Sequence, residues 1–202
     1  MTVSVIGEKT GLVRDAFLAM GHAATSYDLH DTDIPGPHVI VQDDYDLKDI
    51  LCNQYHDFVI SFLPCTRLAN SGVWYVVHNN LYHEVEAAAA LFNMPLKCPA
   101  QKIVCENPIQ HKYARQFIRK YDQTIQPYNF GEDASKRTCL WLKGVPPLQN
   151  TSYFPPRIVN GKKRWGNQTD GGWNKLPPTA DRAEIRSKTY PGIAKAMANQ
   201  WG

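Results

Sequence analysis

The stretch of sequence that decides the fold is Asp57-Phe58-Val59-Ile60-Ser61-Phe62-Leu63-Pro64-Cys65-Thr66. Its apolar run is typical of a central parallel strand, which is buried on both faces of its sheet. The turn Pro64-Cys65-Thr66 would end this strand and present the thiol of Cys65 at its carboxyl end. A thiolate is a strong nucleophile where its pKa is lowered, so Cys65 is a candidate reactive residue. The alternative interpretation is a small buried cysteine, which is the commoner role of this residue type.

Other β-rich runs alternate with helical patterns on both sides of this stretch. Strands are expected at Thr2–Ile6 and at residues 24–28, 38–41, 102–106, 124–126 and 138–142. Helices are expected at residues 13–20, 46–51 and 71–92 and at Pro191–Trp201. This alternation predicts an α/β fold, a doubly wound, Rossmann-like and mostly parallel sheet of about seven strands with helices on both faces. Residues from 143 to about 180 are rich in Pro, Gly and Asn and are expected to be irregular.

The composition limits the class of protein. The chain has 202 residues, 43% of them apolar and 20% charged, which is typical of a globular protein with one domain over residues 1–202. The sequence shows no bilayer-spanning apolar run and no signal peptide, so a cytoplasmic location and no membrane partner are expected. A formal net charge of +3 is too small to argue nucleic-acid binding. The five cysteines and seven histidines lack ligand spacing, so no metal site is predicted.

Polar and glycine residues follow the predicted strands at the points where each strand ends. They are Gly7–Gly11, Asp28, Asp43 with Asp44, Pro64–Thr66 and Glu106–Pro108. Because ligands of such sheets bind outside the carboxyl ends of the strands, we expect these residues to share one rim. Glu106 would supply a carboxylate for proton transfer. Asp28 would accept hydrogen bonds from ribose hydroxyls or else simply start a loop, and the Gly7–Gly11 turn would meet a ligand or be a plain tight turn.

The order of these motifs resembles that of the cytosine-C5 DNA methyltransferases. Pro-Cys follows one strand, Glu-Asn follows the next, and Phe130-Gly131 precedes a basic residue and a strand. The whole chain is similar to a group of small phage-encoded proteins of the cytosine methyltransferase type. The segments that carry this likeness are Arg14–Phe17, Pro35–His38, Pro64–Thr66, Glu106–Pro108, Thr138–Gly144 and Thr189–Ala194. The resemblance therefore covers nearly the whole sequence.

The resemblance implies an activity and a role for each matching residue. Cys65 would add to C6 of cytosine, Glu106 would hold the N3 edge of the ring, and Lys136 stands where the family has the first of two arginines. Thr138 stands where the family has the second, so one cation is lost. The implied cofactor is S-adenosylmethionine, at Glu8, Thr10, Gly11, Asp28, Asp43 and Pro64. The implied substrate contacts are Thr66, Asn107 and Pro108.

Two departures from the family keep other functions open. Glu8, Lys9 and Leu12 replace glycines of the cofactor loop, and the segment at about 143–180 is too short for a target-recognition domain. Lys162-Lys163-Arg164-Trp165 in that segment would contact phosphates and stack a base, or form a solvated loop with a packed Trp. The implied substrate is cytosine in DNA or in a free nucleotide. The alternatives are an inactive nucleotide- or nucleic-acid-binding descendant, which would act against a host defence system, and a modifying enzyme with another donor.

Overall fold

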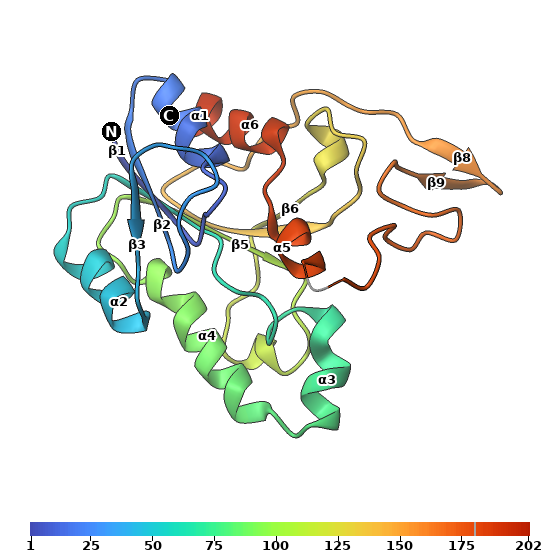
Figure 1. The fold of residues 1–202 in the computed structure, drawn as a ribbon, viewed down its shortest axis with the longest axis horizontal. Coiled ribbons are helices and arrows are strands. Elements are labelled where there is room, and N and C mark those ends of the chain that lie inside the picture. Colours follow the sequence, from blue (N-terminus) through green and yellow to red (C-terminus); the bar gives the residue numbers. More distant parts are fainter. Residues whose placement is uncertain (180) are drawn as a thin grey trace.

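The computed structural model describes residues 1–179 and 181–202. Its main sheet has seven strands in the order β3-β2-β1-β4-β5-β7-β6 (Figure 1). The strands are β1 Thr2–Ile6, β2 Ala23–Asp28, β3 His38–Ile40, β4 Phe58–Ser61, β5 Lys102–Pro108, β6 Gln123–Ile125 and β7 Thr138–Lys143. The first five are parallel, and β7 runs antiparallel to both of its neighbours. The predicted doubly wound, mostly parallel sheet is therefore confirmed.

Helices cover both faces of this sheet (Figure 1). One face carries α1 Leu12–Ala19 and α6 Pro191–Trp201, and the other carries α2 Asp44–Asn53, α3 Val73–His78 and α4 Tyr82–Leu96. Alternate residues of a strand point to opposite faces, so β4 feeds both cores. Phe58 and Ile60 pack in the cluster with α1 and α6, whereas Val59 packs in the cluster with α2 and α4. The continuous apolar run of the sequence reflects this two-sided burial.

The terminal helix α6 forms where the sequence predicts it, from Pro191 to Trp201. Proline is suited to a first helical turn, because its missing N–H would have no partner there. The apolar stripe of the helix is buried, and Trp201 packs edge-on against Phe58 with ring centroids 6.1 Å apart. The indole N–H of Trp201 also donates to the carbonyl of Pro146. These contacts hold α6 against β4 and against the chain that follows β7.

Residues 71–92 do not form the single helix predicted for them. The structure has a 3-10 turn at Asn70–Gly72, then α3, and a separate α4 from Tyr82. Asn80 lies between the two helices with a φ of 54°, in the left-handed region that asparagine tolerates better than most residues. The apolar spacing continues across this break, so periodicity alone cannot show it. Cys98, Cys105 and Cys139 are buried, whereas Cys52 is exposed on α2.

The segment predicted to be irregular contains a β-hairpin. Strands β8 Arg157–Val159 and β9 Lys162–Arg164 form a separate two-stranded sheet that lies far from β1 (Figure 1). Asn160 and Gly161 join them with φ angles of 49° and 72°. Two consecutive left-handed residues make the turn that best suits a two-residue hairpin, and Asn-Gly is its strongest sequence signal. None of the helices in the described ranges is long and apolar enough to cross a membrane.

Candidate functional site

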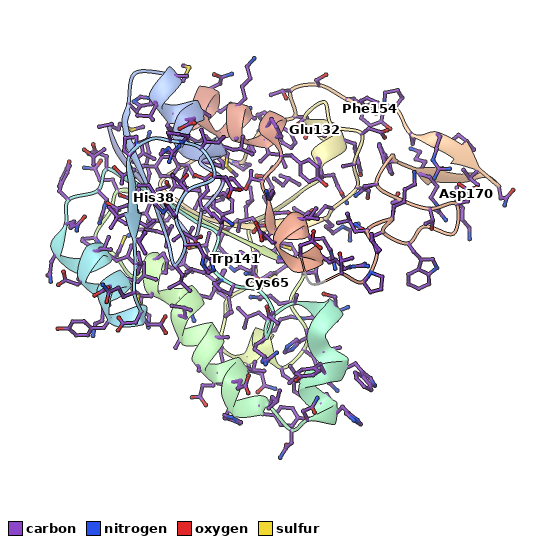
Figure 2. The ribbon with its side chains drawn as sticks, in the orientation of Figure 1. His38, Cys65, Glu132, Trp141, Phe154 and Asp170 are labelled. Carbon is purple, nitrogen blue, oxygen red and sulfur yellow. The ribbon has the colours of Figure 1, made fainter. Side chains whose placement is uncertain are left out.

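The carboxyl ends of β1 to β5 meet at one rim of the sheet, because these strands are parallel. Cys65 lies at this rim in the middle of the molecule (Figure 2). Its carbonyl accepts hydrogen bonds from the backbone N–H groups of Leu68 and Ala69, at 2.9 and 2.8 Å, so the residue begins a tight turn after β4. Glu106 lies within β5, which extends two residues beyond its predicted end. The rim therefore carries a half-buried thiol next to a strand that presents a carboxylate.

The charges of Glu106 and Lys136 act on Cys65, and these two residues line one cavity. Burial raises the pKa of the Cys65 thiol, the negative charge of Glu106 raises it further, and Lys136 and Arg186 lower it. Burial also raises the pKa of Glu106, against the opposing effects of Lys136 and of a hydrogen bond with Thr138. The structure thus brings the three predicted catalytic residues together. It also adds Arg186 of α5 Arg182–Ser187, which the sequence analysis did not single out.

A small cavity lies beside Glu106. The sheet side of its wall is formed by Phe62, Glu106, Ile125, Lys136 and Thr138, and the other side by Ser187, Lys188, Thr189, Tyr190, Ile193 and Met197. Its volume of about 20 Å³ is close to that of one water molecule. The residues between α5 and α6 therefore close this part of the rim. Only the resemblance over Thr189–Ala194 pointed to them, because an irregular segment has no period that shows what it covers.

Two buried polar residues form hydrogen bonds with the backbone on either side of Cys65. Asn107 is fully buried, and its side-chain amide donates to the carbonyl of Leu63 at 3.3 Å. His111 is also fully buried: its Nδ1 accepts from the N–H of Ala114, so its Nε2 carries the proton and donates to the carbonyl of Arg67 at 2.7 Å. These bonds fix Leu63, before Cys65, to β5 and Arg67, after Cys65, to the chain that follows β5. The role of His111 was not predicted, because its partners are distant in sequence.

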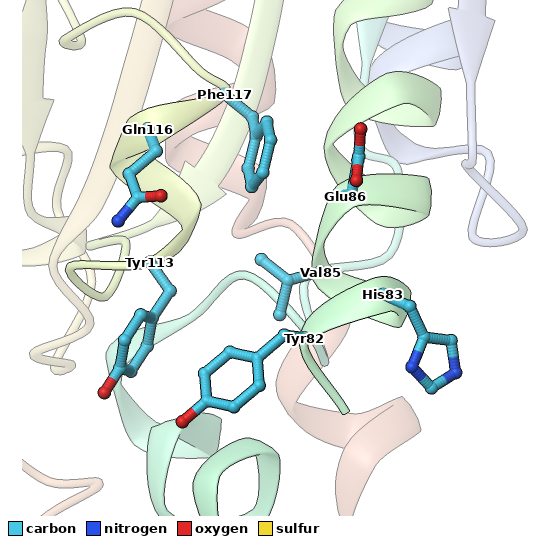
Figure 3. Close-up of a pocket in the computed structure, with 7 residues that line it drawn as sticks. All are labelled: Tyr82, His83, Val85, Glu86, Tyr113, Gln116 and Phe117. Atoms are coloured by element: carbon cyan, nitrogen blue, oxygen red, sulfur yellow. The ribbon is translucent and has the colours of Figure 1, made fainter. Parts of the chain in front are cut away.

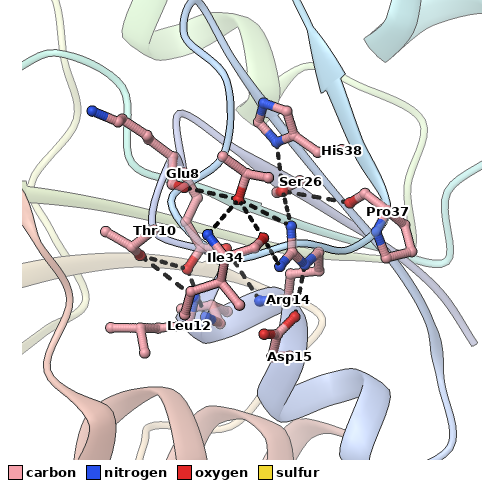
Figure 4. Close-up of polar contacts among 12 residues, drawn as sticks. Glu8, Thr10, Leu12, Arg14, Asp15, Ser26, Ile34, Pro37 and His38 are labelled. Carbon is pink, nitrogen blue, oxygen red and sulfur yellow. Dashed lines mark hydrogen bonds and ion pairs between the residues drawn. The ribbon is translucent and has the colours of Figure 1, made fainter.

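The glycine loop after β1 is filled by the protein's own carboxylate (Figure 4). The two oxygens of Glu8 accept the backbone N–H groups of Val13 and Arg14, at 2.6 and 3.1 Å, and Thr10 also donates to Glu8. Glu8 is 3% exposed, and burial raises its pKa to about 7. A carboxylate is favourable at a helix N-terminus, where N–H groups lack partners within the helix. Glu8 therefore occupies the donors that a ligand anion would otherwise meet at α1.

Arg14 is completely buried behind this loop (Figure 4). Its guanidinium donates to Asp15 Oδ1 at 2.7 Å and to the carbonyl of Ile34 at 2.8 Å. It also donates to the hydroxyls of Ser26 and Thr32, each at 3.2 Å. A Cβ on Gly11 would lie 2.4 Å from one of its nitrogens, so the missing side chain at this position is explained by Arg14. Arg14 thus joins α1, β2 and the loop before β3.

The remaining predicted residues also lie on the rim, and some of them form hydrogen bonds with neighbouring backbone groups. Asp43 caps α2, since its carboxylate accepts the N–H groups of Tyr45 and Asp46. Asp28 ends β2 and is half-buried, and its Oδ1 accepts the N–H of His30 at 3.1 Å. Pro64 and Thr66 are exposed, and Pro108 is half-buried at the end of β5. Asp28 and Asp43 each use only Oδ1 in these bonds, and within the described ranges the second carboxylate oxygen of each makes no hydrogen bond to protein.

Ion pairs tie α5 and the residue after it across this rim. Lys9 of the glycine loop pairs with Glu184 at 3.0 Å and with Asp33 at 3.4 Å. Lys188 pairs with the same Asp33 at 3.2 Å. These pairs link the loop after β1, the loop after β2 and the segment that closes the cavity. We call residues 181–190 the strap.

S-adenosylmethionine, the cofactor that the resemblance implies, fits this rim at its nucleoside end. Asp28 offers a free acceptor at the end of β2, the position at which this type of fold holds ribose hydroxyls. The other end of the cofactor carries a carboxylate, and the N–H groups of Val13 and Arg14 are not available to it because Glu8 accepts them.

In the described part of the chain, no three His, Cys, Asp or Glu residues are placed to hold a metal ion.

A larger hollow of about 340 Å³ lies elsewhere, between α4 and the 3-10 turn Ala114–Gln116 (Figure 3). The residues that line it are Tyr82, His83, Val85, Glu86, Tyr113, Gln116 and Phe117. The rings of Tyr82 and Tyr113 meet edge to face, 5.0 Å apart. None of the residues predicted from the sequence lines this hollow, and no cysteine, serine or threonine does. The rim with Cys65 and Glu106 is therefore the candidate site.

Comparisons with known proteins agree with the fold. No protein-family model and no curated protein matches the sequence. Among solved structures, a prophage-encoded candidate DNA modification methyltransferase of E. coli matches with a TM-score of 0.50 at 12% identity, over 79% of this chain and 53% of that one. The Entamoeba histolytica methyltransferase EhMeth matches with a TM-score of 0.43 at 12% identity, over 79% and 61% of the two chains. This chain thus spans 53% and 61% of the length of these two proteins, and its likeness to the E. coli protein shows that the two share an α/β fold.

Proposed function

We propose that this protein transfers a methyl group from S-adenosylmethionine to C5 of cytosine in DNA or in a nucleotide. The observation that carries the proposal is the grouping of Cys65, Glu106 and Lys136 at the ends of neighbouring strands. A nucleophile, an acid and a cation at one rim are what an addition to a pyrimidine ring requires. The fold, which is that of methyltransferases, agrees with this chemistry.

Cys65 and Glu106 can exchange the proton that the addition requires. Burial raises the pKa of Glu106, so its ionised carboxylate is a better acceptor for a proton, and the negative charge of that carboxylate raises the pKa of Cys65. A proton that passes from Cys65 to Glu106 leaves a thiolate and a neutral acid. The neutral acid donates a hydrogen bond to N3 of the cytosine, and the thiolate forms a bond to C6. Lys136 stabilises the thiolate, because it lowers the pKa of Cys65.

The addition makes C5 electron-rich, and S-adenosylmethionine would supply an electrophilic methyl group there. Loss of the C5 proton to a base and departure of the Cys65 sulfur then restore the aromatic ring and the free enzyme. Asp28 would hold the ribose of the cofactor. Further contacts to cofactor are proposed for Glu8, Thr10, Gly11, Asp43 and Pro64, and contacts to substrate for Thr66, Asn107 and Pro108.

Mass spectrometry of nucleosides tests this proposal. The purified protein would be incubated with S-adenosylmethionine and either DNA or deoxycytidine monophosphate, and the digest searched for 5-methylcytosine. We expect the product with wild-type protein and none with Cys65→Ala. DNA that contains 5-fluorocytosine should become covalently attached to wild-type protein, because fluorine blocks the loss of the C5 substituent. Absence of product and adduct on both substrates would refute methyl transfer to cytosine.

A second function is favoured by the filled glycine loop. Glu8 takes the donors at the start of α1, and the strap reduces the cavity beside Glu106 to about 20 Å³. A protein that keeps the fold and binds a nucleotide or nucleic acid without catalysis would have both features. Calorimetry separates the two functions. Tight binding of DNA or nucleotide with no heat from S-adenosylmethionine supports the binding protein, and heat from the cofactor supports the enzyme.

A further inference from the structure

We propose that the β8–β9 hairpin and the loop at residues 168–174 form a docking surface for the phosphates and bases of DNA. This inference rests on the proposed function and deepens it, because it selects a polymer over a free nucleotide as the substrate. Charge distribution gives the first argument. Residues 151–179 have five basic side chains and one acidic one, a formal charge of +4, while the whole chain carries +3 and the remainder therefore −1. Positive charge is thus concentrated in this segment.

The arginines and lysines of the hairpin have different tasks. Arg157 and Arg164 lie directly opposite each other, a like-charge pair that is destabilising on its own. Both are held by the neighbouring loop: Arg157 pairs with Asp170, and Arg164 donates to the carbonyl of Asp170 at 3.0 Å. Lys162 and Lys163, at the start of β9, are exposed and form no ion pair with the described residues. They are therefore available to phosphate oxygens.

An exposed tryptophan lies on the turn that holds Arg164 of the hairpin. Trp173 is 79% exposed, the highest value among the large apolar side chains described. Its carbonyl accepts from the N–H of Thr169 at 2.8 Å, and its own N–H donates to the Thr169 hydroxyl at 3.1 Å. Gly172, the residue before it, packs against the guanidinium of Arg164. An exposed indole ring in a basic segment is a surface on which unpaired bases stack.

The hairpin is anchored to the segment that carries Lys136. Trp165, which follows β9, is buried and stacks on Tyr128 with ring centroids 4.0 Å apart. Asn167 and Ser135 exchange two hydrogen bonds, of 2.9 and 3.0 Å. The hypothesis that Trp165 stacks a base is therefore wrong, and its alternative, a packed Trp, is confirmed. Because Ser135 precedes Lys136, the docking surface has a defined position relative to the site, as a polymer that reaches both would require.

The experiment measures binding of labelled single-stranded and duplex DNA by fluorescence anisotropy, without S-adenosylmethionine and in a Cys65→Ala background. Lys162→Gln with Lys163→Gln should weaken binding about tenfold at low salt and reduce the slope of log Kd against log salt by about 2. Trp173→Ala should weaken binding of single strands about tenfold and of duplex much less. Lys162→Arg with Lys163→Arg and Trp173→Phe should retain most of the affinity.

The matched control is Lys48→Gln with Lys97→Gln. It removes two exposed lysines away from the hairpin: Lys48 lies on α2, and Lys97 follows α4. It should leave DNA binding unchanged. Equal losses in the control and hairpin variants would overturn the docking surface, as would unchanged binding in the hairpin variants. Binding of the wild type to vesicles of anionic lipid but not to DNA would also overturn it. This measurement does not depend on methyl transfer, so the binding result can be interpreted even if the proposed activity is refuted.

Discussion

The carboxylate of Glu106, on β5, raises the pKa of the Cys65 thiol, which follows β4. The two residues are far apart in sequence and come together because β4 and β5 are parallel neighbours. Glu106 therefore influences the protonation of Cys65. This relationship can be measured in the free protein before any substrate is known.

Glu106→Gln should make Cys65 react faster with iodoacetamide near pH 8. The substitution removes a negative charge, so the pKa of the thiol falls and its thiolate fraction rises. Lys136→Gln should have the opposite effect. Mass spectrometry of the digested protein gives the rate at Cys65, with the exposed Cys52 as an internal reference. A rate at Cys65 that is the same in both variants would show that neither charge lies close to the sulfur.

Glu8→Gln should reduce the loss of stability of the protein as pH rises. The pKa of Glu8 is about 7 in the folded protein against an ordinary 4.5, so the folded state binds more protons between these values. The free energy of unfolding therefore falls as pH rises from 4.5 to about 7, by up to about 3 kcal/mol from this group. Urea unfolding at pH 5, 6, 7 and 8 measures the slope. Glu86→Gln, at an exposed glutamate, should keep the wild-type slope.

Arg14→Met should destabilise the protein by about 3 kcal/mol or more. Removal of the guanidinium leaves the Ser26 and Thr32 hydroxyls and the carbonyl of Ile34 without this donor, inside the protein or at its edge. Chemical denaturation at pH 7 would give the change in the free energy of unfolding. Arg137→Met, at an exposed arginine, serves as the control. A loss below about 1 kcal/mol would mean that the network contributes little to stability.

Lys9→Gln with Lys188→Gln should loosen the strap. These lysines hold Glu184 and Asp33 across the rim, so their loss should free the strap, whose Arg186 acts on Cys65, and make Cys65 more accessible to reagents. The alkylation rate of Cys65 should rise in the variant and become nearly independent of salt. In the wild type, the rate should increase from 0.05 to 0.5 M salt, roughly the range in which exposed pairs are screened. A wild-type rate that does not depend on salt would show that these pairs do not hold the strap closed.

Much of the fold follows from local patterns in the sequence. The apolar run at residues 57–62 and the stripe of α6 each depend on neighbours within a few residues, and both elements form where they are expected. The break at Asn80 lies within a continuing apolar pattern, so the two helices around it read as one. The Asn160-Gly161 turn is a local sequence signal for a hairpin. The high content of Pro, Gly and Asn in this segment nevertheless led to the prediction of an irregular structure.

The candidate site was predictable only in part, because some of its features depend on contacts between segments that are distant in the sequence. Cys65, Glu106 and Lys136 could be placed at strand ends and by resemblance, since sequence order alone indicates which parallel strands share a rim. The inward turn of Glu8, the burial of Arg14 and the position of Arg186 depend on partners that are distant in the chain or on its detailed path. Whether a charged side chain faces solvent or the core is decided by the residues available to pair with it.

The sequence by itself thus determined the α/β class, the order of most elements and a cysteine and a glutamate at the ends of neighbouring strands, because each depends on local periodicity or on chain order. The tertiary structure decided which charges surround Cys65, that the strap closes the rim, and that Glu8 fills the glycine loop. These features depend on packing between segments as far apart as Lys9 and Glu184. Electrostatic interactions act through space, and only the folded chain defines the distances between the charges.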